Sequence, residues 1–548
     1  MDTRQQKLYD DIKRRLTAME TRRYGYERVW QRAAELADPK NANFTVEYGP
    51  GGFNKGTKKT DNTVAQAVPK WASAIDGLTT PKTQKWHGLA TSDEYLNDRY
   101  ADWLERQCDK LFAIRYGAGS NFANAHYENL KNIAIYGAGP FSVTEKYGYG
   151  ISYRAWPVRE FYTEQNADGE VDVFFRKFKL NKRQTLQQFA QNTPRQIIVS
   201  DDLNKEWEFL HAVYPNDDYQ PRRLDPTHRR YASVYVCLST HEIVEESGYN
   251  VCPFFYPRYD VFASLQEPYG YSPVMQLMPE VRTLAAMMRT NLKTAQRASD
   301  PTWLLANDDI INAARVGVPN AIIPGGLNEN GQPLVAPMQG PNAMPFSLEM
   351  LQDIRNTIRE GFELNLFTVL VNRPDMTATE VLQRAQETAT LLSPTTSRLE
   401  KELLSGVITK ELEICTRAGQ LEPMPPEMAE AMASGQVSLQ VRYESPIRKA
   451  QDAGTGAAIL RTVELAGALQ PFDPSIKNLI NAPRILKEIA KVYGAPVKIF
   501  NTEEEKAAAD LSDAQLAQAQ AMLAAAPVIG KTAKDLADAQ QKTGTQVR

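Results

Sequence analysis

The residues best placed to do chemistry lie in a glycine-rich segment at positions 49–59. A phosphate-binding loop needs the pattern GxxxxGK followed by serine or threonine, so that lysine reaches the phosphates and the hydroxyl reaches Mg²⁺. Gly51 and Gly56 have this spacing, but Thr57 and Lys58 stand in the inverse order, and no apolar strand precedes them. We therefore expect a surface loop here and no nucleotide site.

Other catalytic patterns are also missing from the sequence. The segment Gly137-Ala138-Gly139 lacks the third glycine of a dinucleotide-binding fingerprint, and no GxSxG pattern occurs. Paired aspartates such as Asp201-Asp202 are more often solvated than metal-binding. The cysteines and histidines show no metal-ligand spacing, and the scattered cysteines suit a reducing compartment; they are Cys108, Cys237, Cys252 and Cys415, with His87, His126, His211, His228 and His241. The sequence predicts no nucleophile, metal site or cofactor, and hence no enzyme.

Two charged stripes carry more information. On a predicted helix at 274–300, basic residues share one face, and on a second at 347–367, acidic residues do the same. One such stripe is usually a solvated surface. Two complementary stripes on either side of a long insertion indicate a helical hairpin that packs beside copies of itself. The basic residues are Arg282, Arg289, Lys293 and Arg297, and the acidic ones are Glu349, Asp353, Glu360 and Glu363.

The elements that position these stripes follow from apolar spacing. The first helix has a heptad seam from Met278 to Ala295 and ends before Pro301. A segment rich in Pro, Gly and Asn occupies 301–346, and Ser347 is the expected cap of the second helix. After a loop at 368–376, Thr377 and Glu380 form a capping box. The helix that they open extends to about 420 and is expected to bend at Pro394.

The rest of the chain is mixed. Helices are expected at 4–37, 63–78 and 108–137, and β structure at 139–260, with a hairpin turn at Asp168-Gly169. Beyond 420 we expect a strand at 438–443 and helices over 447–495. The Ala/Gln-rich tail at 501–548 suits either a helix or disorder. The fold class is therefore α+β, mainly α.

Charge and hydropathy limit the partners. The 63 basic and 66 acidic residues give a net charge of −3. A protein that grips DNA usually has a basic excess, so DNA would slide past this chain more readily than bind it tightly. No uninterrupted apolar run of 18 residues occurs, so no membrane span is expected.

The order of local motifs resembles podovirus-type phage portal proteins, the head-to-tail connector family. The resemblance covers about residues 60–420. Its motifs read WASAIDGLTTP at 71–81 ahead of Trp86, DGEVDVFFR at 168–176, YGYSP at 269–273 and MTATEV at 376–381. It implies a portal fold assembled as a ring of about twelve subunits. Its parts would be a wing (1–273), a stem helix (274–300), a clip (301–346), a second stem helix (347–367), a tunnel loop (368–376), a long kinked wing helix (377–420) and a C-terminal wing or crown (421–500).

The resemblance also implies a role and partners. Double-stranded DNA would pass through the ring at a capsid vertex of the virion, after assembly in the host cytoplasm. The terminase large subunit would dock during packaging and a tail adaptor protein later, beside capsid and scaffold proteins. The residues expected to line the channel are Val369, Leu370, Val371, Asn372 and Arg373. Two alternatives stay open: another self-assembling capsid protein and, less favoured because no Walker motif is visible, a DNA-packaging ATPase.

Overall fold

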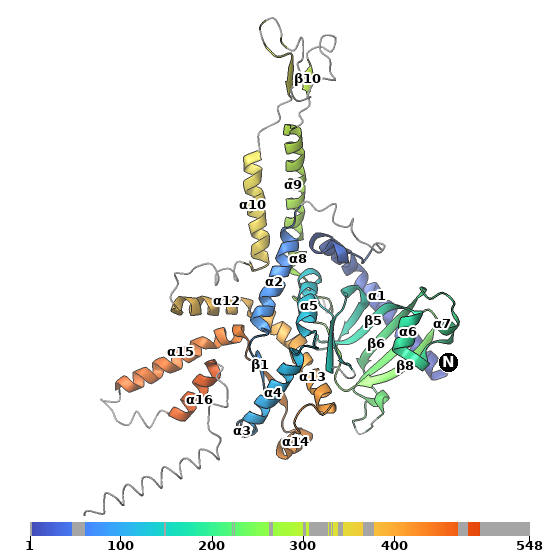
Figure 1. Cartoon of the computed structure of the whole chain (residues 1–548), viewed down its shortest axis with the longest axis vertical. Helices are drawn as coiled ribbons and strands as arrows, with labels where there is room; N and C mark the ends of the chain where they lie inside the picture. Colours follow the sequence, from blue (N-terminus) through green and yellow to red (C-terminus); the bar gives the residue numbers. More distant parts are fainter. Residues whose placement is uncertain are drawn as a thin grey trace, which may run out of the picture.

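The computed structural model describes residues 3–45, 61–146, 150–221, 223, 225–261, 267–299, 303–305, 327, 330, 332–337, 344–364, 378–469 and 481–493. Figure 1 shows a helical body, a β-sheet at one side of it and a two-helix protrusion at the top. The fold is α+β and mainly helical, as predicted. Within the described residues, none of the helices combines the length and the apolar character that a membrane span requires.

The N-terminal helices form the centre of the body. The predicted helices at 4–37 and 63–78 are confirmed. The single helical stretch predicted at 108–137 is wrong, because a turn at 116–121 divides it into two helices. The second of these ends at Gly137, whose φ of 78° suits glycine, and a Cβ there would lie 2.4 Å from the carbonyl oxygen of Gly270. The bounds are α1 Thr3–Ala37, α2 Thr63–Thr79, α3 Glu94–Arg99, α4 Ala101–Arg115 and α5 Phe122–Tyr136.

An antiparallel sheet of five strands, in the order β4-β5-β6-β7-β8, lies beside this body. The predicted hairpin at Asp168-Gly169 is confirmed, and Gly169 has a φ of 80°. The helix α1 packs on one face through Ile12 and Leu16, and two short helices cover the other (Figure 1). The bounds are β4 Phe161–Gln165, β5 Val171–Asn181, α6 Lys182–Phe189, α7 Arg195–Val199, β6 Glu206–Pro215, β7 Tyr231–Cys237 and β8 Glu242–Tyr249.

Two smaller sheets join distant parts of the chain. The predicted hairpin after Gly139 forms the strands β2 and β3, and β9 adds to its edge. The predicted strand at 438–443 is confirmed, but its partner β1 was not predicted; His87 pairs with Tyr443 and Thr91 with Leu439. The bounds are β1 His87–Thr91, β2 Phe141–Lys146, β3 Gly150–Ala155, β9 Phe254–Phe255 and β12 Leu439–Tyr443.

The protrusion consists of two antiparallel helices with a small strand pair beyond them (Figure 1). The helix predicted at 274–300 is interrupted at Leu277. The second helix begins at Met344, so Ser347 lies inside it and does not precede it as predicted. It ends at Gly361, earlier than the predicted 367, because Glu363 adopts a left-handed φ of 56°. The bounds are α8 Pro273–Gln276, α9 Met278–Ser299, β10 Trp303–Leu305, β11 Val335–Pro337 and α10 Met344–Gly361.

A long helical path then crosses the body. It is made of α12 (Ala378–Leu399), a π-helical turn (Glu400–Leu404) and α13 (Ser405–Arg417). The irregularity lies in this π turn and not at Pro394, where the bend was predicted; Pro394 lies within α12. Within the described residues, the helices expected over 447–495 are represented by α15 and α16. The bounds are α14 Pro426–Ala433, α15 Pro446–Leu469 and α16 Ala482–Tyr493.

Short 3-10 turns and one large core complete the fold. The turns are Pro39–Asn41, Val158–Glu160, Ala190–Asn192 and Pro226–His228. The core runs from the helices of the body to the base of the protrusion, and Trp30, Trp71 and Trp86 are fully buried in it. The residues that carry the protrusion therefore belong to the same apolar unit as the body.

Candidate functional site

The protrusion is held together by an apolar inner face. Val281 and Leu284 of α9 and Leu351 and Ile358 of α10 are buried, as successive turns of two facing helices require. Among the described helices, α9 packs chiefly on α10, and α10 also contacts α2. The two helices therefore form one hairpin with a defined inside and outside.

A mostly buried ion pair anchors this hairpin to the body. Nη2 of Arg355 on α10 lies 2.9 Å from Oδ2 of Asp61, just before α2, and the same guanidinium lies 3.6 Å from Sδ of Met288 on α9. Burial alone would raise the pKa of Asp61. Hydrogen bonds from Thr63 and the charge of Arg355 outweigh burial and leave that pKa below its usual value. The anchor was not predicted, because neither residue stands in a motif.

The charged stripes lie on the outer faces of this hairpin. Since successive residues of an α-helix are about 100° apart, the stripes lie roughly opposite the buried positions of each helix. Because those buried positions face each other, the basic stripe and the acidic stripe lie on opposite flanks of the hairpin. The exposed members are Arg282, Arg289 and Lys293 on α9 and Glu349, Asp353 and Glu360 on α10.

Two predicted members of the stripes differ from these six. Arg297 lies within α9, but its side chain is outside the described part. Glu363 lies beyond the end of α10 and is half-buried, and burial raises the pKa of its carboxyl group. Among the described side chains, none of these six charged groups forms an ion pair with any other residue, whereas Arg355 pairs with Asp61. The six are therefore available to a neighbouring molecule.

The charges of the two stripes also match in height. The contact of Met288 with Arg355, and the close approach of Leu277 to Gly361, set the relative position of α9 and α10. Counted from the contact of Met288 with Arg355, equal steps along the antiparallel helices place each basic residue within about one residue, or about 1.5 Å, of the level of one acidic residue. Counted from the contact of Leu277 with Gly361, the offset is about four residues, or about 6 Å. The level pairs are Arg282 with Glu360, Arg289 with Asp353, and Lys293 with Glu349.

The predicted channel-lining residues lie between α10 and α12. Residues 365–377 are outside the described part, and these include Val369, Leu370, Val371, Asn372, Arg373 and Thr377. The helix α12 begins at Ala378, the residue after the predicted cap, and the side chain of Glu380 is not described. The channel lining and the capping box stay predictions.

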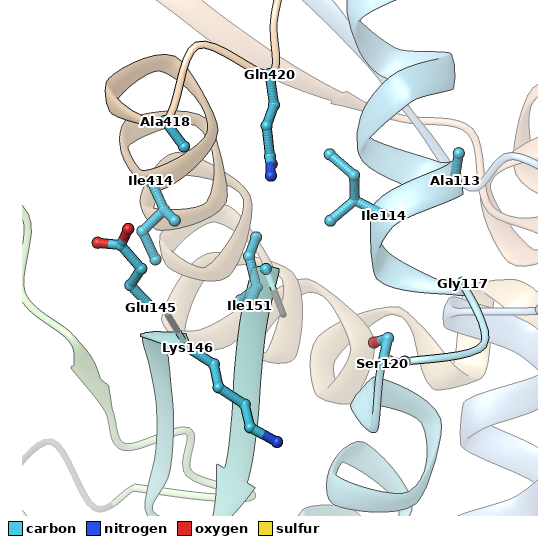
Figure 2. A pocket seen from close by; sticks show the side chains of 12 residues that line it. Ala113, Ile114, Gly117, Ser120, Glu145, Lys146, Ile151, Ile414, Ala418 and Gln420 are labelled. Atoms are coloured by element: carbon cyan, nitrogen blue, oxygen red, sulfur yellow. The ribbon is translucent and has the colours of Figure 1, made fainter. Parts of the chain in front are cut away.

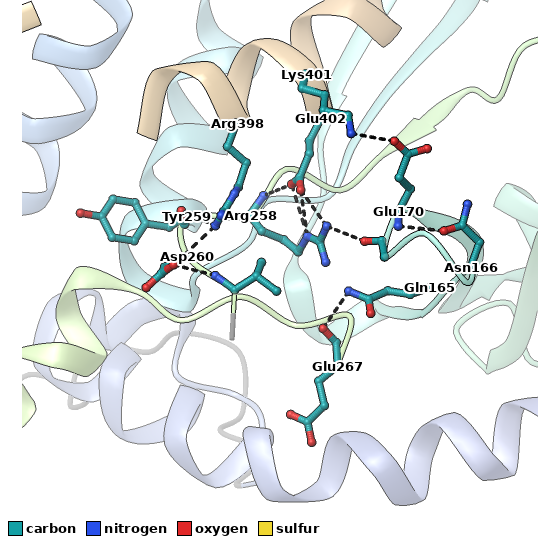
Figure 3. Close-up of polar contacts among 12 residues, drawn as sticks. Gln165, Asn166, Glu170, Arg258, Tyr259, Asp260, Glu267, Arg398, Lys401 and Glu402 are labelled. Atoms are coloured by element: carbon teal, nitrogen blue, oxygen red, sulfur yellow. Dashed lines mark hydrogen bonds and ion pairs between the residues drawn. The ribbon is translucent and has the colours of Figure 1, made fainter. Parts of the chain in front are cut away.

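The π turn after α12 is tied to the β region by ion pairs (Figure 3). Nη2 of Arg258 lies 2.7 Å from Oε1 of Glu402, and the same nitrogen donates to the carbonyl oxygen of Gly169 in the β4–β5 turn at 3.0 Å. Nζ of Lys401 lies 2.8 Å from Oε1 of Glu170 in that turn. The irregular helix turn therefore has a specific set of partners, which no local sequence pattern signals.

A second ionic cluster lies deep in the body. Arg115 forms a two-point ion pair with Glu411 and donates from Nη1 to Nε2 of His87 at 2.7 Å. The hydroxyl of Tyr153 donates to Glu411 at 2.7 Å. Burial, followed by the charge of Arg115, holds the pKa of His87 well below its usual value, so this imidazole is neutral and accepts the hydrogen bond. Each charged group in the cluster is satisfied by another, which is typical of a structural and not a catalytic arrangement.

A surface hollow of about 510 Å³ lies between the end of α4, the β2–β3 hairpin and the end of α13 (Figure 2). Ile114, Ile151 and Ile414 contribute apolar walls, and Gln420 points into it. Glu145 at its edge is paired with Arg417. Its lining holds no pairing of a nucleophile with a base. The described residues also contain no group of three or more His, Cys, Asp or Glu side chains that could hold a metal ion.

Comparisons with known proteins point in one direction. Residues 9–500 match the profile of a protein family described as bacteriophage head to tail connecting protein. The sequence is 24% identical to the portal protein of Salmonella phage epsilon15, over 96% of this chain and 95% of that protein. It is 25% identical to the probable portal protein of Bordetella phage BPP-1, over 87% of this chain and 86% of that protein.

Proposed function

The chain belongs to the family of bacteriophage head to tail connecting proteins, and we propose that it is a portal subunit, part of the channel for DNA at the head-to-tail junction of a virion. The observation that carries this proposal is the family match over residues 9–500, together with relatives that share nearly the whole chain. The protrusion supports the proposal, because it presents opposite charges on opposite flanks, as a subunit that binds copies of itself in a ring requires.

The arrangement of charge supports a closed ring, and the number of about twelve subunits is what the resemblance to the portal family implies. In a rotationally symmetric ring, one flank of each subunit meets the other flank of its neighbour. A basic flank and an acidic flank with level charges, as on α9 and α10, satisfy this requirement. In a ring whose axis runs along the hairpin, Arg289 of one subunit would lie level with Asp353 of the next. The hairpin would be the stem, and residues 301–346 beyond it the clip.

The passage of DNA requires weak contact. With 63 basic and 66 acidic residues, the subunit has no charge excess that would hold a polyanion in the channel. We assign the tunnel loop to residues 368–376, with Asn372 and Arg373 touching DNA transiently and Val369, Leu370 and Val371 packing the loops together. The remaining parts would be the wing, at 1–273 and 377–420, and a C-terminal wing or crown at 421–500.

The partners follow from the position at the junction. We propose that the terminase large subunit docks on the clip during packaging, and that a tail adaptor protein takes its place afterwards. Capsid and scaffold proteins would surround the wing at the vertex, after assembly in the host cytoplasm. The subunit itself would not be an enzyme, and the energy for DNA movement would come from the docked motor.

Native mass spectrometry and negative-stain imaging of the recombinant full chain test this function. The expected result is a closed ring of about twelve copies of the 61.5 kDa chain with a central hole. A stable monomer that hydrolyses ATP would contradict the proposal. Closed shells in place of rings would instead indicate a capsid subunit.

A further inference from the structure

The outer half of α15 has an unusual distribution of apolar side chains. Leu460, Val463, Leu465 and Leu469 are 41%, 36%, 59% and 51% exposed. Single exposed leucines are common on protein surfaces, but a helix that is apolar on more than one side is usually buried. Figure 1 shows α15 extending from the body beside α16 and below α12, with its outer half away from the core.

The side chains divide this half of α15 into four faces. With about 100° between successive residues, Ile459 and Ala466 share the partly buried face. Arg461 and Glu464 share the opposite face, and both are exposed. Charge therefore faces solvent on one side, and the chain's own body covers the other side in part.

The four exposed apolar residues occupy the two remaining faces. Leu460 and Val463 lie on one flank, and Leu465 and Leu469 on the other, about 170° apart. A partner with a single contact surface would cover one flank only. Two flanks separated in this way suit an element that has a neighbour on each side.

We infer that α15 is an intersubunit element, whose Leu460/Val463 flank packs against the Leu465/Leu469 flank of α15 in the next copy of this chain. This inference rests on the proposed ring. A ring with one kind of interface requires each subunit to present two different, complementary surfaces, and the stem hairpin already presents such a pair through its charges. On α15 the two complementary surfaces are apolar, so the contact between neighbouring α15 helices would exclude water. The contact between neighbouring stem hairpins would instead be made by paired charges.

Cysteine cross-linking tests the contact directly. The four native cysteines are buried, so engineered thiols on α15 are the accessible ones. Rings of the variant V463C/L465C, treated with a short bismaleimide, are expected to give a ladder of covalent multimers on a denaturing gel. Each single variant should stop at the monomer or dimer. The control pair R461C/E464C lies on the charged face and should give no ladder.

Labelling rates give a second, independent measurement. The thiol of L465C should react with a fluorescent maleimide about tenfold more slowly in rings than in dissociated subunits, whereas R461C should change little. Rings in which L465C reacts as fast as in free subunits would overturn this inference and leave the portal function standing. Protection of L465C already in free subunits would also overturn it, because the cover would then come from the same chain. A wild-type chain that forms no rings would contradict the portal function itself.

Discussion

Arg115 on α4 and Glu411 on α13 stand 296 residues apart in the sequence and meet as an ion pair whose side chains are 0% and 1% exposed. The pair joins the first half of the chain to the helix that follows the π turn. The hydroxyl of Tyr153 donates a further hydrogen bond to Glu411, and Nε2 of His87 accepts one from Arg115. A buried ion pair inside the apolar core therefore fixes α13, the last part of the helical path that begins with α12.

Loss of the buried ion pair between Arg115 and Glu411 should destabilise the fold strongly. In E411Q, Arg115 stays buried without a counter-charge, and loss of one partner of a buried pair costs about 3–5 kcal/mol. The matched control is E145Q, whose partner Arg417 is half exposed, and its cost should be about 0–1 kcal/mol. Chemical denaturation of both variants measures the difference. Equal losses in the two would mean that the buried pair has no special role.

If the α9–α10 hairpin is the proposed stem, a charge reversal on one stripe should be rescued only by a reversal at the same level of the other stripe. R289E should impair ring formation, because it places like charges between neighbours. Adding D353R on the same chain should restore rings in part, since Asp353 is level with Arg289. Adding E360R instead should not, because Glu360 is level with Arg282. Native mass spectrometry reads the fraction of rings; equal rescue by both second changes would argue against level pairing.

The anchor of the hairpin should depend on pH. The folded-state pKa of Asp61 is lowered, so its contribution is present above the unfolded value of about 3.9 and is lost as the pH falls through the folded value. At pH 7, D61N should cost about 1 kcal/mol after allowance for partial exposure. The gap in thermal stability between wild type and D61N should close below about pH 4. A gap that stays constant down to pH 3 would exclude the ionised pair as its cause.

The proposed tunnel loop at residues 368–376 leads to a prediction about DNA. R373A removes the one cation of the expected loop and should reduce the genome retained per particle severalfold, because a transient phosphate contact is lost. Quantification of DNA in particles from complementation assays measures this. The control R14A removes an exposed arginine from α1, the helix that packs on the five-stranded sheet, and should leave DNA retention unchanged. Normal packaging and retention with R373A would remove DNA contact from the role of this loop.

Local patterns predicted the elements whose signals lie within a few residues. The apolar spacing of α1 and the Asp168-Gly169 turn belong to this class, and both are present. One local signal was overlooked: Asn181 and Gln184 form the capping box that starts α6, and this pattern is visible in the sequence. The start of α6 could therefore have been predicted from the sequence alone.

The features that were missed depend on distant partners. The five residues of β1 form a strand because β12 pairs with them, more than 300 residues later. The π turn at Glu400–Leu404 has no breaker of its own, and Pro394, which has the stronger local signal, lies within regular helix. Glu402 meets Arg258 from 144 residues away. Spacing of residues along one element cannot reveal such contacts, because the partner is set by the tertiary fold.

The opposed stripes of the hairpin have one more consequence, for errors in assembly. If two subunits met face to face about a two-fold axis, the same flank of each would be in contact, so Arg289 would approach Arg289, or Asp353 would approach Asp353. Both pairings repel. In the proposed ring, this repulsion would disfavour head-to-head dimers, which would remove subunits from productive growth, and would favour additions in the same rotational sense. The charges of the hairpin would in this way select the heterologous, ring-forming contact over the two-fold contact during assembly.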